Sequence, residues 1–79
     1  MNKEEFSVYW TDTDDVQHTE LRWVSAETAV ARAHHLAKGP AALLGIVRRI
    51  IITDGLDCCA FLWLRGVGVV FPEQPEVMQ

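Results

Sequence analysis

The sequence predicts a small α+β domain in which an antiparallel sheet of four to five strands carries one helix on one face. Three observations lead to this prediction. Two segments near the N-terminus alternate apolar and polar residues, and a central alanine-rich segment has residues typical of helix ends at both of its termini. A β-branched segment is then followed by Asp-Gly, a strong hairpin signal. The expected order is β-β-α-β-β, with a short fifth strand allowed.

The first two strands are expected at residues 6–11 and 17–24. Apolar residues recur at every second position, which is the period of a strand with one buried face. The intervening segment DTDDVQ is rich in residues whose carboxylates bond nearby backbone amides in turns. The residues predicted for the buried side are Phe6, Val8 and Trp10 in the first strand and Leu21 and Trp23 in the second. His18 is expected on the solvated side.

The helix is expected from about Ala26 to Lys38. Ser25 is a suitable N-cap, and the Gly39-Pro40 pair stops the helix. The predicted buried stripe is mostly alanine, so the helix can lie close to a sheet. Its members are Ala26, Ala29, Val30, Ala33, Leu36 and Ala37. The residues predicted to face away from the sheet are Thr28, Arg32 and His35.

The second hairpin is expected at residues 46–64. Residues 46–53 are almost all β-branched, Asp54-Gly55 is the predicted two-residue turn, and residues 56–64 form the partner strand. Residues 40–45 form a connector with room for one helical turn, and VGVVFP gives a short last strand. We therefore expect a single domain over residues 1–72 and a loose tail over residues 73–79.

Composition limits the classes of function. The chain has 79 residues and a net charge of -4, which argues against nucleic-acid binding by bulk electrostatics. The longest apolar run, residues 58–64, is far shorter than the ~20 residues of a membrane span, so we expect no membrane partner and a cytoplasmic location. A domain of this size buries only roughly 60–65% of its unfolded surface, so a second subunit would add useful core.

Two adjacent cysteines, Cys58 and Cys59, and two adjacent histidines, His34 and His35, raise the question of a metal site. Neighbouring strand residues point to opposite faces, and neighbouring helix residues diverge by about 100°. At most one residue of each pair could join a site, whereas structural zinc needs four ligands, usually with C-x2-C spacing. We expect no metal or cofactor site and interpret the cysteines as buried and unreactive.

Other candidate sites lack essential parts. A disulfide between neighbouring cysteines strains the backbone, and a reactive thiolate needs nearby positive charge, which an arginine near Cys59 could supply. The acidic loop at residues 12–15 lacks the glycine and the spaced acid of a calcium-binding loop. RGVGVVF has no third glycine and no following helix for a phosphate. His34 is interpreted as a half-buried packing residue. No catalytic residues are predicted.

The second hairpin is apolar on both faces, which one helix cannot cover. We expect the alanine face of the helix to pack on the hairpin face that contains Val47, Ile51 and Leu62. The opposite face of the hairpin is then left open. The resulting interface candidates are Arg48, Ile50, Ile52, Phe61, Trp63 and Arg65. An open apolar patch with Trp, Phe and Arg is typical of a protein interface.

The sequence therefore predicts a small noncatalytic protein-interaction module, self-associating as a homodimer. Four alternatives stay open for the patch and the chain. The patch could be core, covered by the last strand or the tail, or it could bind an unknown protein partner. The chain could also bind single-stranded nucleic acid through exposed aromatic residues and Arg48, Arg49 and Arg65. An enzyme using the cysteines or His34 is the remaining alternative.

Overall fold

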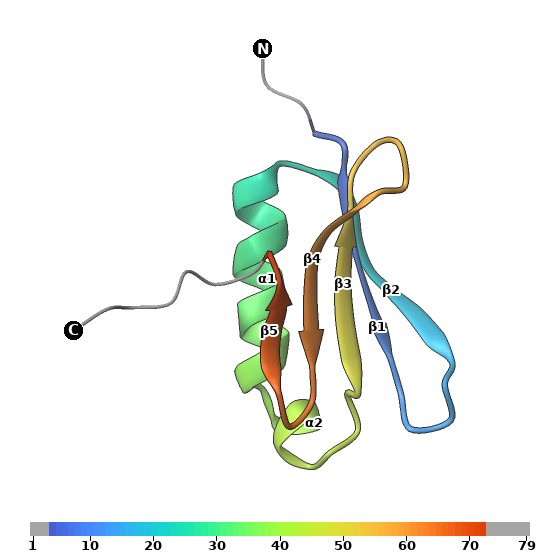
Figure 1. Ribbon diagram of the computed structural model, residues 1–79, viewed down its shortest axis with the longest axis vertical. Coiled ribbons are helices and arrows are strands. Elements are labelled where there is room, and N and C mark those ends of the chain that lie inside the picture. The colour runs from blue at the N-terminus through green and yellow to red at the C-terminus, as the bar shows by residue number, and fades with distance from the viewer. Residues whose placement is uncertain (1–3, 73–79) are drawn as a thin grey trace, which may run out of the picture.

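A computed structural model describes residues 4–72 and shows one five-stranded antiparallel sheet of order β2-β1-β3-β4-β5 (Figure 1). The strands are β1 (Phe6–Thr11), β2 (Gln17–Val24), β3 (Arg49–Thr53), β4 (Cys59–Leu64) and β5 (Gly68–Phe71), and the helices are α1 (Ala26–Lys38) and α2 (Pro40–Leu43). The predicted fold class is confirmed, including the fifth strand. The predicted tail, residues 73–79, lies outside the described residues.

The β1–β2 hairpin has the predicted bounds, but its second strand is irregular. Register shifts interrupt the β1–β2 pairing at two places, and Arg22 and Trp23 together lie opposite Ser7. Trp23 has a φ of 59° and is 55% exposed, so its predicted burial is wrong. A bulge of this kind interrupts the regular alternation of side chains between the two faces of the strand. The apolar pattern of the sequence does not indicate where such a bulge occurs.

Helix α1 also has the predicted bounds and caps. The Ser25 hydroxyl oxygen accepts a hydrogen bond from the Thr28 amide at 3.2 Å, and Gly39 is the C-cap. The predicted helical turn follows as α2, which packs against α1. Within residues 4–72, neither helix is both long and apolar enough to cross a membrane.

The β3–β4 hairpin differs from its prediction at the turn. The Asp54 carboxylate accepts hydrogen bonds from the amides of Leu56 at 2.8 Å and Cys58 at 3.0 Å. These bonds close a longer loop, so both strands are shorter than predicted. Ile50 pairs with Trp63, whereas a two-residue turn at Asp54-Gly55 would set it opposite Cys59. An aspartate that binds amides two and four residues ahead favours a capped loop over a two-residue turn.

The hydrophobic core lies between α1 and one face of the sheet. Helix α1 contacts β1, β2 and β3, and Ala29 and Ala33 are fully buried. The sheet side of the core consists of Val8, Ile50, Ile52 and Phe61, with Phe6, Trp10, Leu21, Val24, Trp63 and Val69 around them. Of the predicted helix stripe, Ala26 and Val30 are exposed instead of buried.

The two buried alanines let α1 approach large sheet residues, so a larger side chain there should strain the fold. We expect Ala33→Leu to lower the free energy of unfolding by about 1–3 kcal/mol, the usual cost of overpacking a filled core. Urea unfolding monitored by circular dichroism measures this. Ala31→Leu is the matched control, since Ala31 is exposed on the same helix. Equal stability of the two variants would contradict the proposed close packing.

Candidate interface on the open sheet face

The sheet face opposite α1 carries a continuous row of residues, one from each strand. The pairings join Thr19 to Tyr9, Tyr9 to Ile51, Ile51 to Leu62 and Leu62 to Phe71. We call this surface the open face, because no helix or strand of the described chain covers it. A second row on the same face contains Gln17, Thr11, Arg49, Leu64 and Gly68.

The accessible part of the open face is mainly apolar. Ser7 and Thr11 lie on this face but are only 3% exposed. Tyr9, Ile51 and Leu62 are partly exposed, and Phe71 at the end of the row is 45% exposed. The row therefore offers two aromatic and two aliphatic side chains across four adjacent strands.

Arginines are the charged residues that the five strands place on the open face. Arg49 lies beside Thr11 and Leu64, and Arg22 lies opposite Ser7 with its guanidinium 5.2 Å from the centre of the Trp23 ring. Arginine and aromatic residues are enriched in protein interfaces, and the arginines also suit anionic partners.

The four apolar interface candidates were predicted on the uncovered side of the sheet, and that placement is wrong, whereas the role of the two arginines in an interface stays a prediction. Ile50, Ile52 and Phe61 are 0%, 1% and 6% exposed beneath α1, and Trp63 packs against the same core. Arg48 is exposed and lies 3.4 Å from the Asp15 carboxylate. Arg65 is also exposed, with its guanidinium next to Gly45.

The reason is the pairing between the two hairpins. Val8 pairs with Ile52 and Trp10 with Ile50, so the buried face of β1 continues into this face of β3. The division of the β3 residues between two faces was predicted correctly, but the face that α1 covers was not. Open-face residues Ile51 and Leu62 belong to the set that had been predicted to lie under the helix.

The cysteines do not have the predicted buried environment. Both are free and exposed, Cys58 in the loop and Cys59 at the start of β4. Thr53 pairs with Cys59 while Ile52 pairs with Phe61, so an irregularity at Ala60 brings Cys59 onto the open face. Among residues 4–72, no group of three or more His, Cys, Asp or Glu side chains is placed to hold a metal ion.

His18 is held in a cluster rather than solvated as predicted. Its ring stacks on Trp10 with centroids 4.2 Å apart, and its Nε2 lies 2.8 Å from the Asp12 carboxylate. The same carboxylate accepts hydrogen bonds from the amides of Asp14 and Val16. The hydrogen bond from His18 and those from the loop amides lower the pKa of Asp12, with desolvation opposing them.

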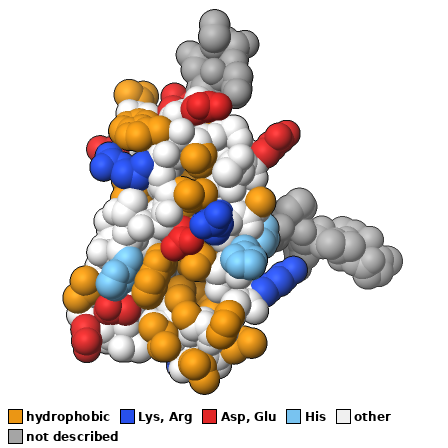
Figure 2. Space-filling view, turned by 180° about the vertical axis from the view of Figure 1, so that it is seen from behind, with side chains coloured by type: hydrophobic (Ala, Val, Ile, Leu, Met, Phe, Trp, Pro, Cys, Tyr) orange, Lys and Arg blue, Asp and Glu red, His pale blue; other side chains and the backbone are white. Residues whose placement is uncertain are grey.

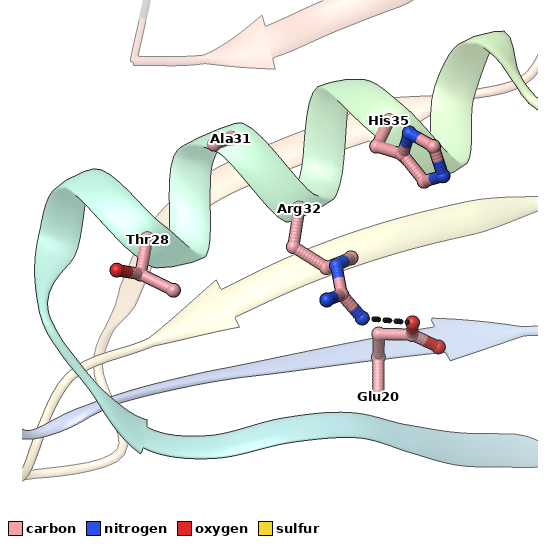
Figure 3. A pocket seen from close by; sticks show the side chains of 5 residues that line it. All are labelled: Glu20, Thr28, Ala31, Arg32 and His35. Atoms are coloured by element: carbon pink, nitrogen blue, oxygen red, sulfur yellow. Dashed lines mark hydrogen bonds and ion pairs between the residues drawn. The ribbon is translucent and has the colours of Figure 1, made fainter.

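A polar hollow of about 590 Å³ lies between α1 and β2 (Figure 3). The guanidinium of Arg32 donates to the Glu20 carboxylate at 2.8 Å across it. Thr28, Ala31 and His35 complete the lining, so the three helix residues predicted to face away from the sheet, Thr28, Arg32 and His35, all border this hollow. The two charges neutralise each other and are partly exposed to solvent. We therefore interpret the ion pair as a contact that links α1 to β2, not as a ligand site.

His34 is more exposed than predicted, although it does pack. Its ring meets Phe61 edge-on, with centroids 5.8 Å apart, beside an apolar hollow at β4 and β5.

A separate apolar region lies on the helix side, at the end of the molecule where α2 lies, where Figure 2 shows hydrophobic side chains gathered. Leu43 and Leu44 there are 79% and 76% exposed.

Comparisons with protein-family models, with curated proteins and with solved structures each gave no significant match. Functional inference therefore depends on the geometry and chemistry of this chain. Of its exposed surfaces, the open face combines the greatest continuity across the sheet with aromatic, aliphatic and arginine side chains.

The Asp12 cluster predicts a pH dependence of stability. Because folding lowers the pKa of Asp12, its stabilisation is present above the ordinary aspartate pKa of about 3.9 and is lost as pH falls through the lower folded value. Asp12→Asn should therefore be less stable than wild type at pH 7, with the difference shrinking below about pH 4. Urea unfolding across pH measures this, with exposed Asp14→Asn as control. A difference that does not change with pH would contradict it.

Proposed function

We propose that this chain is a small noncatalytic protein-interaction module that self-associates as a homodimer through its open face. The observation that carries the proposal is the apolar row Tyr9–Ile51–Leu62–Phe71 on a face that no described element covers. Sheets usually bury an apolar face against another layer. A cytoplasmic location fits, since two free exposed cysteines suit a reducing compartment.

The face is a better docking surface than the edges of the sheet. Edge strand β2 pairs irregularly with β1 and carries charged residues, including Glu20 and Arg22. Edge strand β5 has only four residues, and its pairing with β4 also contains a register shift. Short, bulged or charged edges resist the addition of another strand. Association by stacking faces is therefore favoured over extension of the sheet.

The size of the face suggests a dimer of modest affinity. Five strands spaced about 4.8 Å apart, each about six residues long at ~3.3 Å per residue, cover roughly 450 Å² per copy. Two copies would therefore bury roughly 900 Å² in total, which is below the about 1,200–2,000 Å² of stable interfaces and in the range of weak, transient contacts. We expect a monomer–dimer equilibrium that depends on concentration.

A charged residue in the centre of the row should prevent association. We expect wild type to approach twice the chain mass of 8.9 kDa at high concentration, and Leu62→Glu to stay monomeric. Light scattering over a concentration series measures both. Phe71→Glu is a second test at a more exposed position, where a fold defect is less expected.

Leu56→Glu is the matched control, because Leu56 is 85% exposed in the β3–β4 loop outside the row. It should dimerise like wild type, and circular dichroism should show that all variants are folded. A wild-type protein that is monomeric at every concentration would disprove self-association. Equal dimerisation of the Leu62 and Leu56 variants would place the interface elsewhere.

Single-stranded nucleic-acid binding is the second candidate, favoured by one observation. The strands place arginines but no acidic residue on the open face, next to the aromatic side chains of Tyr9 and Phe71. Bases stack on aromatic residues and arginines contact phosphates. The aliphatic centre formed by Ile51 and Leu62 and the net charge of -4 favour a protein partner instead.

Fluorescence anisotropy with a labelled oligothymidylate separates the two functions. The homodimer proposal predicts that Tyr9→Ala does not reduce any binding of the oligothymidylate at low salt. Binding that weakens with salt and is lost in both Tyr9→Ala and Phe71→Ala would favour the nucleic-acid function and count against the homodimer.

A further inference from the structure

We propose that the segment that follows β5, residues 73–79, docks in the apolar hollow between α1 and the β4–β5 pair, on the helix side of the sheet. The hollow lies on the side opposite the open face, so the inference does not depend on the proposed self-association. Three observations carry it: an apolar hollow that no described residue fills, the position of Pro72 in its lining, and the sequence of the segment.

The hollow exists because α1 does not extend over the whole sheet. The helix packs mainly on β1, β2 and β3, whereas β4 and β5 lie farther along the sheet (Figure 1). Phe61 and Trp63 of β4 pack against the core, and Val69 of β5 pairs with Trp63. Apolar side chains therefore continue along the helix side beyond the helix, where a further apolar layer would remove them from water.

The hollow is apolar and large enough to take side chains. Its volume is about 320 Å³, equivalent to roughly ten water molecules. Val30, which was predicted in the buried stripe of α1, is 38% exposed at this hollow. Five of the six lining residues are apolar and none is acidic; they are Val30, His34, Ala60, Phe61, Val69 and Pro72.

The segment starts at the hollow itself. Pro72 is the last described residue and also part of the lining, so residue 73 begins at the edge of the hollow. A ligand tethered through a short linker has an effective concentration on the order of millimolar, so even a weak contact leads to docking. A free partner needs a tighter contact to reach the same occupancy. Proximity therefore favours the chain's own segment over a second copy or a foreign protein.

The sequence of the segment, EQPEVMQ, suits a return to the hollow. Proline favours the second position of a β-turn, so a turn over residues 74–77 is expected, with Pro75 at that position. Such a turn brings its first and last Cα atoms within about 7 Å of each other. Val77 is then held near Gln74, which is only two residues from Pro72 in the chain.

Val77 and Met78 are the two side chains that we expect to enter the hollow. Methionine is unbranched and flexible, so it fills irregular apolar space well. Glu73 and Glu76 stay in water, since docking needs only the apolar pair. The docked segment would bury part of the exposed Val30 surface.

Nuclear magnetic resonance of the full chain tests the contact. We expect nuclear Overhauser contacts from the Met78 methyl group to the Phe61 ring and to the Val69 methyl groups. Val30→Glu puts a charge in the hollow, so it should lower the ratio of docked to free segment by at least about tenfold. Val16→Glu is the matched control and should keep the contacts, because Val16 is 51% exposed in the β1–β2 loop. Circular dichroism checks that both variants are folded.

A change in the segment alone gives a second test that does not alter the described domain. Met78→Glu should shift the resonances of Phe61 and Val69 while leaving those of Ile51 on the open face unchanged. Gln79→Glu adds the same charge at the neighbouring position and is the control, which should leave the hollow resonances as in wild type.

Two results would overturn the inference. Segment resonances that match those of the free peptide EQPEVMQ would show that the segment does not dock, and would leave the hollow to a foreign partner. Contacts that arise only between copies, detected in a mixture of isotope-labelled and unlabelled chains, would assign the hollow to the segment of a second copy.

The Leu62→Glu variant separates this inference from the proposed function. Leu62 lies on the open face, so the Met78 contacts should persist in this variant whether or not the wild-type chain dimerises. A wild-type monomer that shows the contacts would disprove the homodimer and support the docked segment. A wild-type dimer without the contacts would support the homodimer and disprove the docked segment.

Discussion

The antiparallel pairing of β1 with β3 is the constraint on which the rest of the structure depends. It joins two hairpins that are separated by the whole of α1, and it sets Val8 against Ile52 and Trp10 against Ile50. Since strand side chains alternate with a period of two, this one register assigns every residue of the sheet to the helix side or the open side. A slip by one residue would exchange the core and the surface of β3.

Helix α1 then determines how much of the sheet is covered. Its alanine face brings it close to β1, β2 and β3, where Ile50 and Ile52 fill the space that small helix residues leave. A single helix of thirteen residues can cover one face only, so the apolar side chains of the other face stay accessible. The exposed apolar face is thus a consequence of a two-layer fold built from strands that are apolar on both sides.

Local patterns predicted the elements well because local chemistry determines them. Ser25 and Gly39 cap α1 as expected, and alternation in residues 6–11 gave the buried side of β1. The choice of helix-covered face failed because it depends on β1–β3 register, which no short segment encodes. The predictions for Trp23, Cys59 and the Asp54 turn were wrong for a related reason. Bulges and side-chain caps add residues that a regular alternation does not predict.

The exchange of faces changes the residues of the proposed interface but not its origin. Both faces of the β3–β4 hairpin are apolar, and α1 covers one of them. The surface that remains differs from the predicted one in a useful way. Its centre is formed by Ile51 and Leu62, which suit sheet-on-sheet packing. Aliphatic side chains on a face that no described element covers gain free energy when a second apolar surface removes them from water, and the proposed self-association would supply that surface.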